Sequence, residues 1–296
     1  MHSRSLAIYF AILTFLCTAV IVGALELGKN GAYLAQVYML TPALAALITR
    51  LFFYPPRFSD AALRFGRLGD YVRYWLFSLG IVVLFSSTYT VLGAVHWDFT
   101  GNVFLARLAG QFAAAGQDMT ASLPPGFTAQ TMLLVYFIGG LTVFNILPGL
   151  ITGFGEEFGH RGFMFPLLFR IRPWVGLIIG GLIWFAWHLP LALVVPQTQA
   201  AQTVPLLNFV VLAIGSICTF IYLAYVYVRT QSIFVVSIAH IAINNAAQSM
   251  SYFAELRDQL LANIGTTLVM LLIVLLLHVR GELKVFHREA RATRLS

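Results

Sequence analysis

The chain has 296 residues, of which 59% are hydrophobic and only 10% are charged, and its mean hydropathy is +0.85. An ordinary soluble domain carries about 25% charged residues, so this composition excludes that class of protein. The formal net charge of +7 does not indicate nucleic acid as a partner, because the basic residues are distributed as they are in membrane proteins, where they orient the chain.

Apolar runs of about 20 residues recur along the chain, which is the length that an α-helix needs to cross the hydrocarbon core of a bilayer. They predict about eight spans, near residues 6–26, 33–53, 73–95, 129–150, 174–195, 205–228, 232–250 and 263–280. The first run is interpreted as a span and not as a signal peptide, because it is long and lacks a small-residue cleavage site. We therefore predict an all-α, polytopic helical membrane bundle, a single domain over residues 1–296, with an internal polar cavity open to the cytosolic leaflet.

Two segments between the predicted spans have their own character. Residues 96–128 include the apolar helix candidate FLARLAGQFAAAG, which predicts an extracytoplasmic loop with an interfacial helix. Glycine and proline are concentrated in residues 148–166, which predicts a short, bent connection at the membrane surface after the fourth span.

The distribution of charge predicts the topology. Eight spans place both termini on one side of the membrane, and that side carries 15 of the 18 Lys and Arg residues, Arg50 and Arg161 among them. By the positive-inside rule both termini are cytosolic. The basic tail, residues 281–296, then faces anionic headgroups, so membrane lipid is an expected partner.

Ionisable and amide side chains inside membrane spans are costly and usually functional. The sequence has few of them, at Glu156, Glu157, His160 and Arg161 after the fourth predicted span, His188 in the fifth, and His240 and Asn244 in the seventh. We expect His160 to face the headgroups and leave it out of the site.

Helical spacing relates these residues to one another. Glu157 and Arg161 are four positions apart and can pair along one helix face. His240 and Asn244 have the same spacing, so both project from one side of their helix and need a polar partner. The economical arrangement brings them together inside the bundle with the nearest unsatisfied acid, Glu156, and with the lone imidazole of His188.

Such a set can hydrolyse an amide bond without a Ser or Cys nucleophile. A carboxylate acts as general base on water, and an amide with an imidazole can donate hydrogen bonds to a developing oxyanion. The alternative is an open three-ligand zinc site formed by Glu156, His188 and His240.

Three motifs in order, EExxxR at 156–161, WxxxH at 184–188 and HxxxN at 240–244, resemble the CAAX-protease and bacteriocin-processing (CPBP) family. Its members are intramembrane endopeptidases related to the eukaryotic CAAX prenyl endopeptidase. Trp184 stands where Phe is commonest in the family. The three motifs together cover about 90 residues, within 156–244.

The resemblance implies that Glu156 activates the attacking water with help from His188. His240 and Asn244 would stabilise the oxyanion, and Glu157 with Arg161 would maintain the shape of the motif. The family has been described both as zinc metalloproteases and as metal-independent glutamate proteases, and we expect catalysis without an obligatory metal, zinc being the alternative cofactor. The implied substrate is a peptide or a lipid-modified, for example prenylated, protein, and the implied location is the bacterial inner membrane.

Two other classes of function stay open. A proton-coupled transporter would use Glu156 and the histidines as a relay, and would be expected to have inverted repeats, of which the sequence shows none. A non-catalytic membrane scaffold or immunity protein would retain its function with alanine at both Glu156 and His240.

Overall fold

The computed structural model describes residues 2–27, 34–114, 118–119, 126, 128–191 and 206–287. The regular elements within these ranges are helices, apart from two three-residue strands. The elements are α1 (His2–Glu26), α2 (Leu34–Met39), α3 (Thr41–Phe52), α4 (Leu68–Val91), β1 (Val95–Trp97), α5 (Asn102–Ala114), α7 (Ala129–Leu141), α8 (Val143–Gly159), the π-helix η2 (His160–Met164), α9 (Phe165–Ile171), α10 (Pro173–His188), α12 (Leu206–Thr230), α13 (Ile233–Ser251), β2 (Ala254–Leu256) and α14 (Gln259–Val279).

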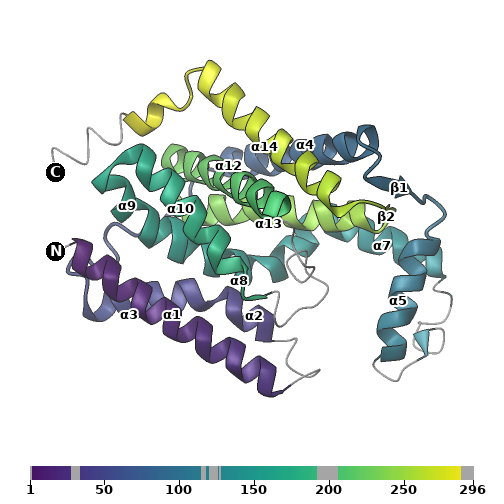
Figure 1. Ribbon diagram of the computed structural model, residues 1–296, viewed down its shortest axis with the longest axis horizontal. Helices are drawn as coiled ribbons and strands as arrows, with labels where there is room; N and C mark the ends of the chain where they lie inside the picture. The colour runs from purple at the N-terminus through teal and green to yellow at the C-terminus, as the bar shows by residue number, and fades with distance from the viewer. Residues whose placement is uncertain are drawn as a thin grey trace.

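The helices form one bundle with α8 near its centre. Helix α8 packs against α3 on one side and α13 on another, while α12 packs against both α10 and α14. Figure 1 shows α1–α3 on one side of α8 and the layer of α4, α12, α13 and α14 on the other. The start of α1 and the last described residues after α14 lie at the same end of the bundle (Figure 1).

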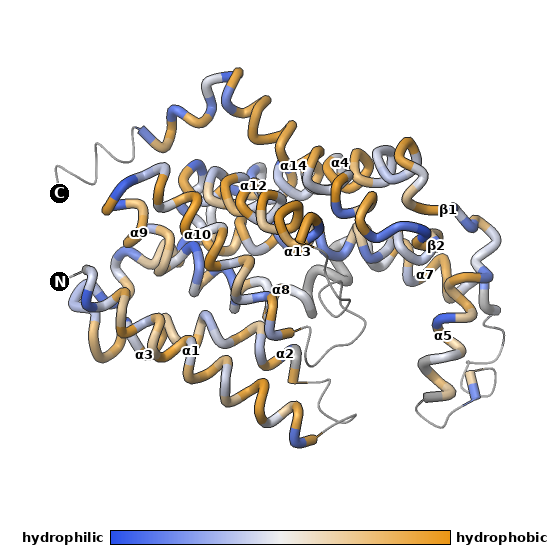
Figure 2. The backbone as a smooth tube through the Cα atoms, viewed as in Figure 1, coloured by the Kyte–Doolittle hydropathy of each residue, from blue (hydrophilic) through white to orange (hydrophobic). Residues whose placement is uncertain are grey.

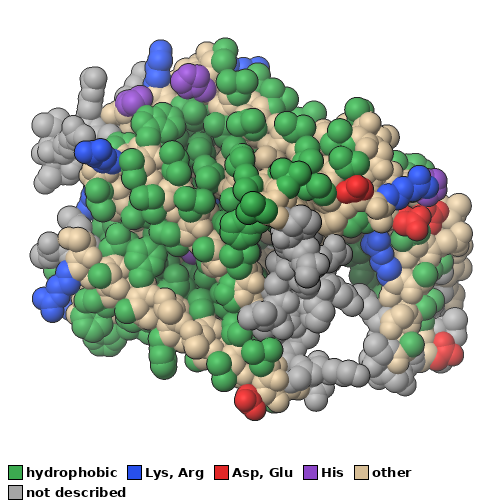
Figure 3. Space-filling model, viewed as in Figure 1, with side chains coloured by type: hydrophobic (Ala, Val, Ile, Leu, Met, Phe, Trp, Pro, Cys, Tyr) green, Lys and Arg blue, Asp and Glu red, His purple; other side chains and the backbone are tan. Residues whose placement is uncertain are grey.

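Five helices in the described part of the chain are long and apolar enough to cross a membrane, namely α1, α4, α12, α13 and α14. Three shorter apolar helices, at 36–52, 130–141 and 173–188, correspond to the other predicted spans. Helix α14 is hydrophobic along most of its length in Figure 2, although more than half of its residues are not buried. Figure 3 shows hydrophobic side chains over most of the visible face, with Lys and Arg mainly toward its edges. The predicted all-α membrane bundle is confirmed, and this surface is the one that lipid would cover.

The predicted bent connection after the fourth span is wrong. Helix α7 ends at Leu141, and the single residue Thr142, whose backbone is extended (φ −110°, ψ 171°), separates it from α8. Helix α8 then continues without a loop through η2 into α9. The glycines of this region serve close packing instead. A Cβ on Gly159 would lie 2.4 Å from the backbone of Pro42 in α3, so only glycine permits this approach. The glutamate pair therefore lies within a helix and not after one.

The segment after α4 contains the helix that its sequence predicted, α5. Phe104 and Leu108 of this helix pack against Leu133 of α7. Strand β1 pairs antiparallel with β2, which joins this segment to the connection between α13 and α14. Part of the predicted loop lies outside the described residues, and its position at the membrane interface stays a prediction.

Candidate active site

Glu157 is the centre of a buried ion network. Its side chain is 0% exposed, and Arg161, one helical turn later in η2, donates from Nη1 to Glu157 Oε1 over 2.9 Å. The Arg161 guanidinium also lies over the rings of Trp184 and Phe220, at 4.9 and 4.3 Å from their centroids. A carboxylate and two aromatic faces thus compensate this buried cation.

His240 of α13 contacts the same carboxylate. Its Nδ1 lies 2.7 Å from Glu157 Oε1, so one oxygen receives both Arg161 and His240. The sequence reasoning grouped His240 with Glu156, whereas the structure pairs it with Glu157. This contact joins α13 to α8 and leaves the Nε2 atom of His240 free of Glu157.

Glu156 faces His188 of the second motif, at the end of α10. Its Oε2 lies 3.8 Å from His188 Nε2, and the Nδ1 of His188 is held by the Trp184 carbonyl at 2.7 Å. The carboxylate is almost fully buried, but the His188 side chain is 35% exposed. Among the described residues of this cluster, His188 is therefore the most exposed.

Trp184 occupies a more central position than sequence reasoning gave it. Its Nε1 donates to Glu156 Oε2 over 3.4 Å. Its ring contacts those of His188 and His240, with centroids 4.8 and 5.7 Å away. From the sequence we noted Trp184 only as a replacement for the family's usual Phe. The available signal for this position was that the indole ring, unlike that of Phe, has a hydrogen-bond donor.

His160, which we expected at the headgroups, is buried, and so is its neighbour Arg161. His160 and Arg161 are fully buried because the helix continues through η2 into the bundle. The His160 ring packs edge-on against Trp187, with 5.2 Å between centroids, and neither ring nitrogen has a hydrogen-bond partner in the described part of the chain. The prediction that His160 faces the headgroups is wrong.

Arg50, which we counted among the basic residues of the cytosolic side, is also buried. It pairs with Asp60 at 2.6 Å and donates from Nη2 to the Gly162 carbonyl, also at 2.6 Å. This side chain therefore fixes the backbone of η2 next to Arg161. Its place inside an apolar helix was the signal that could have revealed it.

Asn244 does not join the buried group. It lies one turn beyond His240 on α13, but it is exposed, and no hydrogen bond connects it to another described residue. The structure thus brings together Glu156, Glu157, Arg161, His188 and His240, and it leaves Asn244 at the edge of this set. The oxyanion role of Asn244 stays a prediction.

The residues only partly suit the alternative zinc site. Both imidazoles are anchored through Nδ1, which is the usual orientation of metal-binding histidines. However, among the described residues no three His, Cys, Asp or Glu side chains are grouped closely enough to hold one ion. The predicted ligand set of Glu156, His188 and His240 does not fit a metal in this arrangement, and we derive no catalytic step from one.

The fold and the site define a polytopic helical membrane protein. Its buried ionic cluster includes one partly exposed side chain, His188. Residues 138–246 match the Rce1-like family, described as "Type II CAAX prenyl endopeptidase Rce1-like". This segment contains all three motifs, and the match confirms the resemblance to CAAX proteases that they predicted. It supports a CAAX-type protease, which implies a peptide or protein substrate. No curated protein matches the chain.

Proposed function

We propose that this protein is an intramembrane endopeptidase in which Glu156 is the general base that activates water. The observation that carries the proposal is the 3.8 Å approach of the Glu156 carboxylate to Nε2 of His188, the most exposed side chain of the cluster among the described residues. Both residues lie within the family-matched segment. This distance is too long for a direct hydrogen bond between the two groups, so both can hydrogen-bond to the same water molecule.

The proposed reaction is a direct attack of water on a peptide carbonyl. Glu156 accepts a proton from the water while His188 orients it, and the oxygen adds to the carbonyl carbon. The tetrahedral intermediate collapses when Glu156 returns this proton to the leaving amine. No covalent acyl-enzyme forms, because the attacking group is water.

The second histidine is suited to the negative charge of the intermediate. Because His240 Nδ1 donates to Glu157, donation from Nε2 to an oxyanion requires the imidazolium form. In that form Arg161 and His240 balance the two carboxylates of Glu156 and Glu157, so the buried cluster is neutral as a whole. Asn244 would add a second donor once substrate is bound.

The substrate in this proposal is a peptide or a lipid-modified protein that reaches the site from within or beside the membrane, with a prenylated C-terminus as the family's example. Both termini would be cytosolic, in the bacterial inner membrane. The exposed edge at His188 is the entrance that such a substrate would use.

The test compares the wild type with Glu156→Gln on a quenched peptide library in proteoliposomes. Removing the base at constant shape should reduce cleavage by about 10²–10⁴-fold. The matched control is Glu282→Gln, an acid outside the cluster that should leave cleavage unchanged. Equal cleavage by wild type and Glu156→Gln at equal thermal stability would refute the proposal. Activity that a chelator abolishes and zinc restores would replace the metal-independent mechanism with a metal-dependent one.

A further inference from the structure

A separate hollow of about 310 Å³ opens between the loop after α3, the helix α9 and the end of α12. It does not include any residue of the candidate active site. Its wall contains two arginines, Arg64 and Arg170, and both are exposed. The hollow lies among the elements that connect to the basic loop between α3 and α4.

The charge inside this hollow is positive. Its one acidic lining residue, Asp60, is engaged by neighbours through both carboxylate oxygens, with Arg50 at 2.6 Å and the Tyr54 hydroxyl at 2.5 Å. The Arg64 guanidinium, in contrast, has no ion pair or side-chain hydrogen bond within the described ranges. Asp60 therefore does not neutralise Arg64, and the Arg64 guanidinium can donate hydrogen bonds to an anion bound in the hollow.

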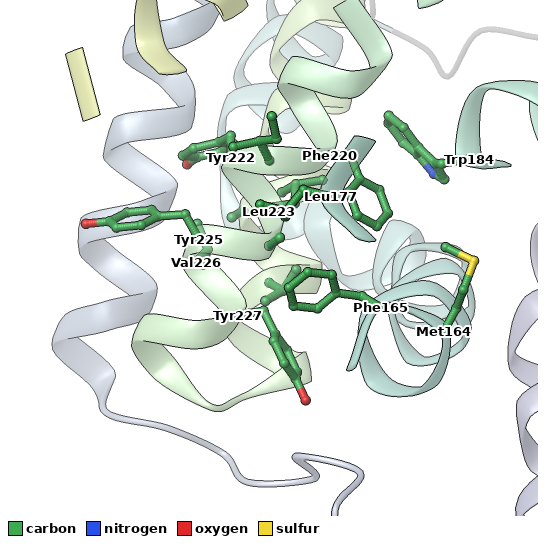
Figure 4. Close-up of a cluster of buried hydrophobic side chains, with 14 of the residues drawn as sticks. Met164, Phe165, Leu177, Trp184, Phe220, Tyr222, Leu223, Tyr225, Val226 and Tyr227 are labelled. Carbon is green, nitrogen blue, oxygen red and sulfur yellow. The ribbon is translucent and has the colours of Figure 1, made fainter. Parts of the chain in front are cut away.

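The floor of the hollow is aromatic. Phe165 packs against Phe169 and Tyr227, with centroid distances of 5.1 and 6.0 Å. Figure 4 shows Phe165 directed toward α12, while the Tyr227 hydroxyl points away from the hydrophobic cluster. A cationic wall above an apolar floor matches a ligand that has an anionic head and an apolar body.

The backbone around the hollow is held in an uncommon conformation. Ala62 and Gln231, both lining residues, have φ values of 52° and 50°, in the left-handed region that L-residues with side chains rarely adopt. Two hydrogen bonds fix the loop against α13: the Ile233 N–H donates to the Ala62 carbonyl at 3.1 Å, and Ser232 donates from its hydroxyl to the Arg64 carbonyl. The walls are thus preformed, and strained residues of this kind concentrate at binding sites.

We propose that this hollow binds the phosphate group of an anionic ligand, with Arg64 and Arg170 as the phosphate-binding residues and the aromatic floor beneath its apolar part. Guanidinium groups bind phosphate in a bidentate manner, and basic pockets between membrane helices are suited to lipid headgroups. The shared chemistry is a phosphate ester or free phosphate, and the two sources are separable by experiment.

The test measures binding of a fluorescent phosphatidylglycerol to the full chain in neutral detergent. The double variant Arg64→Gln/Arg170→Gln should weaken binding at least tenfold, while Arg67→Gln, an exposed arginine that does not line the hollow, should not change it. Lys instead of Gln at position 64 should give part of the wild-type affinity, since lysine keeps the positive charge but lacks the planar guanidinium. Unlabelled diacylglycerol, which has the chains but no phosphate, should not compete.

Inorganic phosphate provides the second arm. Displacement of the probe by millimolar phosphate would identify free phosphate as a sufficient ligand, and no displacement would identify the lipid headgroup. Equal binding by the double variant and Arg67→Gln at matched thermal stability, or competition by diacylglycerol as strong as by the phospholipid, would overturn the proposal. The readout is independent of peptide cleavage, and Glu156→Gln should bind the probe like the wild type.

Discussion

Replacing Glu157 by leucine tests the buried ion network directly. Its carboxylate receives Arg161 at 2.9 Å and His240 at 2.7 Å, and the Arg161 side chain is fully buried. The substitution keeps most of the volume but leaves a buried guanidinium with no carboxylate. Breaking a buried pair by removing one partner costs about 3–5 kcal/mol, because the remaining charge is uncompensated. The partly exposed pair of Arg229 and Glu282, 3.9 Å apart, should contribute less than about 1 kcal/mol.

The assay is reversible unfolding in mixed micelles of SDS and a mild detergent, with the free energy of unfolding compared among variants. Glu282→Leu is the control for loss of an acidic residue in a more exposed pair. A double-mutant cycle with Arg161→Met then isolates the coupling, since replacing both partners by apolar residues is often close to neutral. We expect the double variant to be more stable than Glu157→Leu by at least about 1 kcal/mol, with the remaining loss arising from His240.

A small effect would contradict this reasoning. If Glu157→Leu changes the free energy of unfolding no more than Glu282→Leu does, Arg161 does not depend on this carboxylate. If the changes in the free energy of unfolding caused by the Glu157 and Arg161 substitutions are strictly additive, the two side chains are likewise not coupled.

Three further variants test neighbouring contacts. Gly159→Ala should destabilise the protein by about 1–3 kcal/mol in the same assay, because its Cβ would meet the Pro42 backbone at 2.4 Å; a neutral result would mean that α3 and α8 are not this close. Trp184→Phe removes a long hydrogen bond to Glu156 and should lower kcat by less than about tenfold, so a larger loss would give the indole a role that this geometry does not explain. His160→Phe should leave the unfolding temperature unchanged or higher, since no described partner of its nitrogens is lost, and a marked decrease would reveal a bound water.

Local features of the sequence carried the prediction of the bundle. Runs of apolar residues are sufficient to locate membrane helices, because a helix satisfies its own backbone hydrogen bonds and needs only length and hydropathy to be stable in lipid. All eight predicted segments accordingly contain an apolar helix. The contact between Glu157 and Arg161 has the same local origin, since a spacing of four brings side chains together within one helix.

Glycine-rich stretches were harder to interpret. Gly155 and Gly159 suggested a turn, because glycine relieves turn strain, yet the same residue also permits close helix packing. The local sequence does not distinguish a turn glycine from a packing glycine. The distinction depends on the partner helix, α3, which approaches Gly159 in the folded protein.

The sequence by itself determined which segments are helices and which side chains carry chemistry, because these depend on neighbours along the chain. Only the tertiary structure decided that His240 contacts Glu157, that Trp184 reaches Glu156, that His160 is buried and that Asn244 is exposed. These outcomes depend on how each helix is rotated about its axis. In a membrane both the lipid-facing and the protein-facing sides of a helix are apolar, so hydropathy does not fix that rotation, and the packing of side chains does.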